Sequence, residues 1–110
     1  MSDLTRTFAA LSDPTRLALV ETLIRRGELP AGDLVAEAEI SAPAISRHLK
    51  VLREAGLVDQ RAQGTHRFYA VRPEALRAIV DWTMDHRAFW STSLDRLDTL
   101  LALDPGEGER

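Results

Sequence analysis

The sequence predicts a mainly α-helical fold with a small β-hairpin, made of about five helices and two strands. Three observations lead to this prediction. Apolar residues recur at three- and four-residue spacing in several segments, as they do on the packed face of a helix. Residues 41–56 contain both a helix start and a helix stop. Two short stretches, 58–61 and 65–71, read as strands joined through Gln63-Gly64, because glycine permits a turn at positive φ.

The chain has the size and composition of one small globular domain. Its 110 residues are 45% apolar and 28% charged, and no apolar run approaches the roughly 18 residues of a membrane span. We expect a domain over residues 1–103, a flexible tail over 104–110, no membrane partner and, because no signal peptide is visible, a cytoplasmic location. Dimerisation is a common supplement at this size. The absence of cysteine excludes disulfides and thiolate metal sites.

The N-terminal part of the chain reads as two helices and a connector. Residues 3–11 predict a short helix that packs, including across a dimer, through Leu4, Phe8 and Leu11. Asp13 caps a second helix, Pro14 lies in its first turn and Gly27 ends it. The apolar stripe of this second helix is predicted to be Leu17, Val20, Leu23 and Ile24. The segment 28–32 is a connector.

Residues 33–56 predict two further helices separated by a tight turn. Asp33 caps the first of them, which runs to about Ala38. Ser41 caps the second, which covers residues 42–55 and is ended by Gly56 in a left-handed conformation. Two short helices joined in this way form a helix-turn-helix, in which the first helix braces and the second reads.

The second of these helices has two different faces. Short side chains on its outer face would let the backbone approach a DNA major groove, while Arg47 and Lys50 reach base edges or phosphates. An ordinary solvated face with two basic residues is the alternative interpretation. The outer face is Pro43, Ser46, Arg47 and Lys50, and the packing face is Ile45, His48, Leu49 and Leu52.

The hairpin that follows favours the DNA interpretation. It carries Arg61 and Arg67 on its arms and Thr65 and His66 near its tip, so it looks like a wing that lies along a phosphate backbone. Residues 41–72 hold six basic residues against two acidic ones, a local charge of +4, which leaves −7 on the rest of a chain whose net charge is −3. Affinity for phosphate follows the local patch rather than the total charge.

A long helix is predicted after the hairpin, opened by Pro73 and covering residues 74–103. Its apolar residues exceed what one face of a small monomer can bury, and a large exposed apolar patch normally marks an interface. We therefore expect a two-fold homodimer, which would place two reading helices about one DNA turn apart. The alternative is a helix that folds back on its own core with a break near residues 85–86. The expected interface residues are Leu4, Phe8, Trp82, His86, Phe89, Trp90, Leu94, Leu97 and Leu101.

One pattern carries a family resemblance. Ser41-x-Pro-x-x-Ser-x-His-Leu-Lys-x-Leu-x-x-Ala-Gly-Leu-Val, followed by Arg61, Gly64 and Tyr69, resembles the winged helix-turn-helix core of the ArsR/SmtB-type bacterial transcriptional repressors. Asp13-Pro-Thr-Arg matches the start of that family's second helix, so the resemblance covers residues 8–101. It implies a dimeric, sequence-specific regulator that binds an inverted-repeat operator in double-stranded DNA.

The resemblance also implies which residues meet DNA. Position 42 is often glutamine in relatives but is Ala42 here, so base recognition is expected to rest on Arg47 and on DNA shape. The family counterpart of His48 supports the reading helix and can approach DNA. The expected DNA-binding residues are Ser41, Ala42, Pro43, Ser46, Arg47, His48, Lys50, Arg61, Thr65, His66 and Arg67.

The family's metal sites do not match this sequence. The best-known site lies in Glu-Leu-Cys-x-Cys-Asp-Leu, and its two cysteine positions are Pro30 and Gly32 here. We expect no metal and no cofactor, and the Trp82, His86, Phe89, Trp90 cluster resembles a subgroup without obvious metal ligands, whose members can respond to an unknown effector. A zinc- or nickel-responsive regulator that uses His86 with nearby carboxylates is the alternative. These carboxylates are Asp81, Asp85, Asp95 and Asp98.

An enzyme is not expected, because the three histidines are widely separated and no nucleophile, base or metal cluster is visible. The alternative from another class is a winged-helix module that binds proteins and not DNA, since a fold alone does not fix a function.

Overall fold

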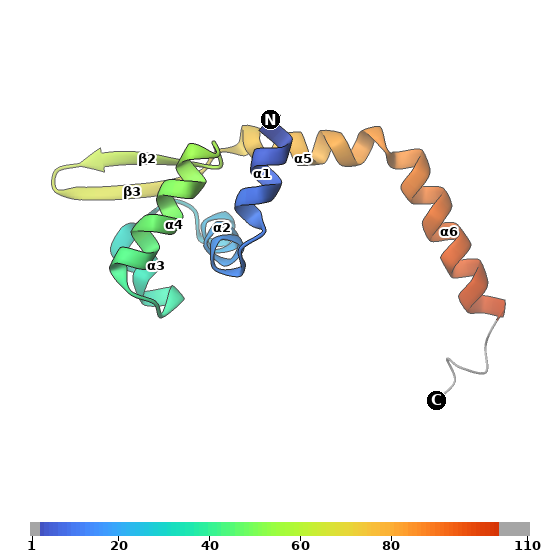
Figure 1. Cartoon of the computed structure of the whole chain (residues 1–110), viewed down its shortest axis with the longest axis horizontal. Coiled ribbons are helices and arrows are strands. Elements are labelled where there is room, and N and C mark those ends of the chain that lie inside the picture. Colours follow the sequence, from blue (N-terminus) through green and yellow to red (C-terminus); the bar gives the residue numbers. More distant parts are fainter. Residues whose placement is uncertain (1–2, 104–110) are drawn as a thin grey trace. The chain divides into compact units, whose positions relative to one another are not determined.

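The computed structural model describes residues 3–103, so the predicted tail over 104–110 lies outside the described residues. Contacts divide the chain into an N-terminal unit that ends at Ala78 and a C-terminal unit that begins at Ile79. No helix among the described residues combines the length and the apolar character needed to cross a membrane. In chain order the elements are α1 Asp3–Leu11, α2 Pro14–Arg26, β1 Leu29–Pro30, α3 Ala31–Ala38, α4 Ala42–Glu54, β2 Val58–Gln63, β3 His66–Val71, α5 Pro73–Asp85 and α6 Arg87–Leu103 (Figure 1).

The caps predicted for α2 and α4 are confirmed. The Asp13 carboxylate accepts the backbone N–H of Arg16 at 3.0 Å, and the Ser41 hydroxyl accepts that of Ala44 at 3.3 Å. Each bond satisfies an N–H that has no partner within its helix. Gly27 ends α2 at a φ of 83°, which a side chain would strain.

The start predicted for α3 is wrong, and so is the connector before it. Residues Leu29–Pro30 form a short strand, β1, which pairs with β3. This pairing holds Pro30 in an extended conformation, with φ −72° and ψ 155°, and the helix begins directly after it at Ala31. Asp33 therefore lies in the first turn of α3 instead of capping it, where its charge still favours the helix dipole.

The three strands form an antiparallel sheet in the order β1-β3-β2. We call β2, the turn Gly64-Thr65 and β3 the wing. Gln63 pairs with His66, so β2 runs two residues further toward the tip than the predicted range 58–61, whereas β3 begins one residue later than the predicted range 65–71. Gly64 has a φ of 63°, as the predicted glycine turn requires.

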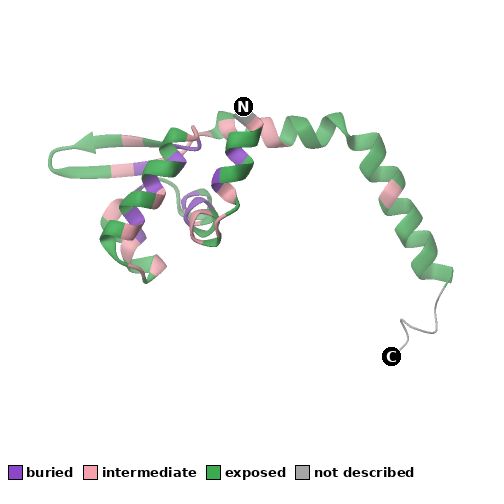
Figure 2. Cartoon of the chain, in the orientation of Figure 1, coloured by how far each residue is buried: buried purple, intermediate pink, exposed green. Residues whose placement is uncertain are grey.

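The core of the N-terminal unit lies between α1–α4 and the base of the wing, where the buried positions gather (Figure 2). Leu34, Leu52 and Leu57 are fully buried, each with an exposed fraction of 0%. The predicted stripe of α2 is partly wrong, because Leu17 and Ile24 are exposed and Leu19 is buried instead. Thus α2 turns a slightly different face to the core than the periodicity predicted.

The single helix predicted over 74–103 is also wrong, because the chain breaks at His86 into α5 and α6. In a continuous helix the carbonyl of Trp82 would accept the backbone N–H of His86. Here that N–H donates to Thr83 at 3.2 Å, and the His86 Nδ1 lies 2.7 Å from the Trp82 carbonyl oxygen. The imidazole of His86 thus contacts the Trp82 carbonyl oxygen in place of the backbone N–H of His86. A side chain that inserts into the helical hydrogen bonds in this way is a recognised cause of a helix break. The break lies where the alternative interpretation placed it.

Candidate nucleic-acid interface

The two faces predicted for α4 are confirmed by burial. Ile45, Leu49 and Leu52 are buried to an exposed fraction of 1% or less. The opposite side of the helix is exposed from its first turn to its middle. Because the buried side fixes the helix in the core, the exposed side is held in a defined orientation. Its residues are Ser41, Ala42, Pro43, Ser46, Arg47 and Lys50.

The cations of α4 are not neutralised by neighbours. None of Arg47, Lys50 and Arg53 has an ion pair with a carboxylate of the residues that the structure describes. Arginines elsewhere in the N-terminal unit do pair, such as Arg26 with Glu37 and Arg72 with Asp59. The exposed side of α4 is therefore a patch of uncompensated positive charge, which suits an anionic partner.

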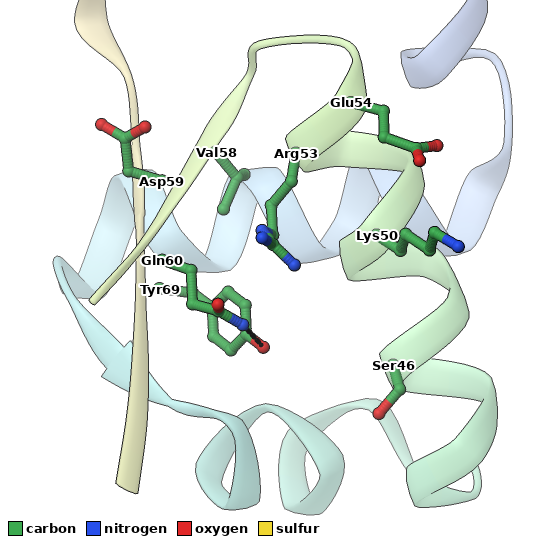
Figure 3. A pocket seen from close by; sticks show the side chains of 8 residues that line it. All are labelled: Ser46, Lys50, Arg53, Glu54, Val58, Asp59, Gln60 and Tyr69. Atoms are coloured by element: carbon green, nitrogen blue, oxygen red, sulfur yellow. Dashed lines mark hydrogen bonds between the residues drawn. The ribbon is translucent and has the colours of Figure 1, made fainter. Parts of the chain in front are cut away.

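An open groove of about 650 Å³ lies between α4 and the base of the wing (Figure 3). Arg53 on α4 and the hydrogen-bonded pair Gln60 and Tyr69 on the strands point into it. The Gln60 Nε2 donates to the Tyr69 hydroxyl at 2.7 Å, and the Tyr69 ring is buried. The groove is lined by Ser46, Lys50, Arg53, Glu54, Val58, Asp59, Gln60 and Tyr69.

The wing turns its two arginines to opposite faces, because successive residues of a strand alternate between faces. Ala62 pairs with Arg67 and Gln60 pairs with Tyr69, so Arg67 shares the face of the groove. Arg61 pairs with Phe68 on the other face, with its guanidinium 4.8 Å from the centre of that ring. The sequence predicted both arginines on the arms but could not place them on different faces.

Arg61 is engaged within the protein. Its Nε and Nη2 donate to the two carboxylate oxygens of Glu28 at 3.1 and 2.7 Å, and its Nη1 donates to Gln63 at 2.8 Å. The hydrogen bond from Arg61 holds the pKa of Glu28 below its usual value. The role of Glu28 was missed, because this residue lies 33 positions from Arg61 and in a segment predicted as a connector.

The remaining predicted contact residues occupy two places. Thr65 and His66 are exposed at the tip of the wing. His48 is half-buried on the inner side of α4, with its Nδ1 3.9 Å from the Asp13 carboxylate. Arg16 donates from its Nε to the Ala10 carbonyl at 2.7 Å, so it fastens the end of α1 to α2.

The predicted interface residues of α5 and α6 are exposed in the single chain. Trp90, Leu94, Leu97 and Leu101 recur at four-, three- and four-residue intervals and form one stripe along α6. Trp82 lies beside His86 and Trp90, with ring centres 4.9 and 6.3 Å apart, and Phe89 lies 5.0 Å from Trp90. In the N-terminal unit, Leu4 is half-buried and Phe8 is exposed.

The described residues offer no ready metal centre. No group of three or more histidine, aspartate or glutamate side chains within residues 3–103 is placed to hold an ion. The Nδ1 of His86 is taken by the Trp82 carbonyl.

A helix-turn-helix with a basic outer helix and an adjoining wing is a winged helix-turn-helix, an architecture that suits DNA binding. Residues 13–60 match the protein family described as "Bacterial regulatory protein, arsR family". Together with the relatives described below, one of them 43% identical over 81% of this chain, this match shows that the chain belongs to the ArsR family. The names of the family and of these relatives indicate a transcriptional regulator and not an enzyme.

Three known proteins illustrate this relationship. The HTH-type transcriptional regulator Rv2034 of Mycobacterium tuberculosis is 43% identical over 81% of this chain and 79% of its own length. The transcriptional repressor SdpR of Bacillus subtilis is 32% identical over 71% of this chain and 86% of its own. A homodimeric winged helix-turn-helix DNA-binding domain from Mycobacterium bovis, solved by NMR, is 25% identical over 78% of this chain and 82% of its own, with a TM-score of 0.64.

Proposed function

We propose that this protein is a homodimeric transcriptional repressor that binds an inverted-repeat operator in the cytoplasm of a bacterium. The observation that carries the proposal is the exposed side of α4, where Arg47, Lys50 and Arg53 have no carboxylate partner among the described residues. Arg67 lies on the face of the wing that carries the groove residues Gln60 and Tyr69. The Bacillus relative is a transcriptional repressor, which supports the same function.

In this proposal α4 enters the major groove with its first turn foremost. Ser41, Ala42 and Pro43 are short enough for the helix backbone to approach the base pairs, and Ser46 and Arg47 face the base edges. Lys50 and Arg53 lie one to two turns further along and would contact phosphates. The tip of the wing, with Thr65 and His66, would follow the adjacent backbone.

Dimerisation would proceed through the apolar surface of the last two helices. The stripe of α6 and the aromatic residues around His86 are exposed in one chain and would be covered by the same surface of a second chain. Leu4 and Phe8 of α1 are the further residues that we expect to contact the second chain. The homodimeric state of the Mycobacterium bovis domain supports the arrangement.

Fluorescence anisotropy of a labelled DNA fragment from the gene's own upstream region tests the proposal. We expect salt-dependent binding of the parent protein. The Arg47→Ala variant should lose about 1–3 kcal/mol of binding free energy and relax the sequence preference, because a base contact is removed. Arg25→Ala is the matched control, since Arg25 is exposed on α2 and lies 3.7 Å from Glu37.

Two outcomes would contradict the proposal. If no duplex binds in a salt-dependent way, the protein is better explained as a protein-interaction module. If Arg47→Ala binds like Arg25→Ala, the assigned face is wrong. Repeating the titration in chelator and then with zinc or nickel tests the metal-responsive alternative, because only that alternative expects the affinity to change.

A further inference from the structure

We propose that the two arginines of the wing have different tasks: Arg67 contacts the phosphate backbone, whereas Arg61 is a positioning residue that, with Glu28, fastens the wing to the helix-turn-helix. This inference rests on the proposed DNA binding and assigns the part that each arginine plays in it.

Arg61 uses three of its five guanidinium N–H donors within the protein, so two are left for a phosphate. Both carboxylate oxygens of Glu28 and the side-chain oxygen of Gln63 accept from its three guanidinium nitrogens at 2.7 to 3.1 Å. A carboxylate bound through two parallel N–H bonds is a stronger and more directional partner than a single contact. A phosphate bound by the remaining N–H donors would lie beside the negatively charged carboxylate of Glu28, which opposes such a contact.

The Arg61–Glu28 pair spans the whole sheet. Glu28 directly precedes β1, Arg61 lies on β2, and β3 runs between them. The Arg61 side chain crosses β3 to reach Glu28, and its guanidinium lies over the Phe68 ring of that strand. The Arg61–Glu28 pair thus ties the outer strand of the wing to the segment between α2 and α3, and so limits how the wing can tilt about its base.

Arg67 is placed as a phosphate contact should be. It lies on the groove face, and no carboxylate of the described chain pairs with it. Its Nη1 lies 3.4 Å from the Gln60 side-chain oxygen, a neutral acceptor that orients the guanidinium without cancelling its charge. Gln60 is held in turn by the Tyr69 hydroxyl.

Replacing Glu28 by glutamine separates the two possible tasks of Arg61 by the sign of the effect. If Arg61 contacted phosphate, Glu28→Gln would free it and tighten DNA binding. If Arg61 positions the wing, the same change weakens binding, by about two- to fivefold for an exposed ion pair. Glu37→Gln is the matched control, because Glu37 is also an exposed glutamate paired with arginine and its loss changes the net charge equally.

The salt dependence of binding provides a second, independent measurement. The slope of log K against log salt should fall by about 1 per wing in Arg67→Ala, because one phosphate contact is lost. Arg61→Ala should keep the slope of the parent protein and bind more weakly at every salt concentration. The exchange variant E28R/R61E should recover affinity relative to Arg61→Ala, with circular dichroism confirming that each variant is folded.

The outcomes are distinguishable from a failure of the proposed function. If the parent protein binds no DNA, it is the proposed function that fails. If the parent binds but Glu28→Gln binds as tightly as Glu37→Gln, Arg61 does not position the wing. If Glu28→Gln binds more tightly, or if Arg61→Ala lowers the slope as Arg67→Ala does, Arg61 contacts phosphate. Each of these results overturns the inference.

Discussion

The N-terminal unit and the C-terminal helices differ in where their apolar side chains find cover. In the N-terminal unit Leu34, Leu52 and Leu57 are completely removed from solvent, whereas α5 and α6 contain no buried residue. Leu97 and Leu101 have exposed fractions of 50 and 64%. Helices owe most of their stability to packing on an apolar face, so the first unit has what it needs within one chain. Beyond Ala75 and Leu76, which pack against the core of the N-terminal unit, we propose that α5 and α6 gain their cover from a partner surface.

Local contacts in the C-terminal unit do not replace such a surface. The rings of Trp82, His86, Phe89 and Trp90 touch one another, but they belong to neighbouring turns around one helix break. Contacts of this kind order neighbouring turns, but they leave the apolar side chains of the helix exposed to solvent. The comparison therefore predicts that substitutions in the first unit change folding, whereas substitutions on α6 change association.

The largest effect should come from the core of the N-terminal unit. Leu52→Ala removes a fully buried side chain and should lower the free energy of unfolding by about 2–5 kcal/mol. Urea denaturation followed by circular dichroism measures this loss. Leu100→Ala is the control in α6, where the side chain is 63% exposed, and it should cost much less at a concentration where the protein is monomeric. Equal losses would remove the distinction between the two units.

A smaller effect, on association, should come from the stripe of α6. Leu97→Asp places a charge in the proposed interface and should weaken the dimer on the order of 10- to 100-fold, leaving the N-terminal unit folded. Thr99→Asp adds the same charge to an exposed position outside the stripe and serves as the control. Sedimentation equilibrium compares the two variants. A Leu97→Asp protein that dimerises as well as Thr99→Asp would place the interface elsewhere.

The smallest effect should be the pH dependence of the α2 cap. The backbone N–H of Arg16 is the main cause that holds the pKa of Asp13 below its usual value of 3.8, and the charges of His48 and Arg16 act in the same direction. A lowered pKa means that the charged form favours the folded state, so this contribution is present above pH 3.8 and is lost as the pH falls through the folded pKa.

Acid unfolding of Asp13→Asn measures this contribution. Asparagine keeps an acceptor for the Arg16 N–H but does not titrate, so the stability difference between the two proteins should shrink below pH 3.8. A difference that stays constant down to pH 2 would show that the charge of Asp13 contributes nothing to the cap.

Local signals explain what the sequence could predict of the fold and the site. Ser41 and Gly56 mark the ends of α4, and the spacing of Ile45, Leu49 and Leu52 fixes which side is exposed. Each of these signals acts within a few residues of where it is read. The helix-turn-helix, the glycine turn of the wing and the outer face of α4 were therefore predictable.

Features that depend on distant residues were not predictable in this way. The strand β1 has two residues, one of them proline, and exists because Leu29 meets Tyr69, 40 positions away. The ion pair of Glu28 with Arg61 depends on the same pairing of β1 with β3, because Glu28 directly precedes β1. The break at His86 was placed only by the alternative interpretation, because the regular apolar spacing on both sides favours one continuous helix and conceals a side chain that bonds to a backbone carbonyl.

The short strand β1 also gives the wing a gradient of local stability. At the base, Phe68 and Tyr69 of β3 pair on both sides, with β1 and with β2. Toward the tip, Gln63 and His66 belong to an exposed two-stranded ribbon, a structure that is only marginally stable alone. Opening of the tip thus costs little free energy, while opening of the base disrupts the sheet, and amide hydrogen exchange is the observable that follows this gradient. The tip of the wing can therefore adapt to DNA grooves of different width, while the base of the wing stays attached to the sheet.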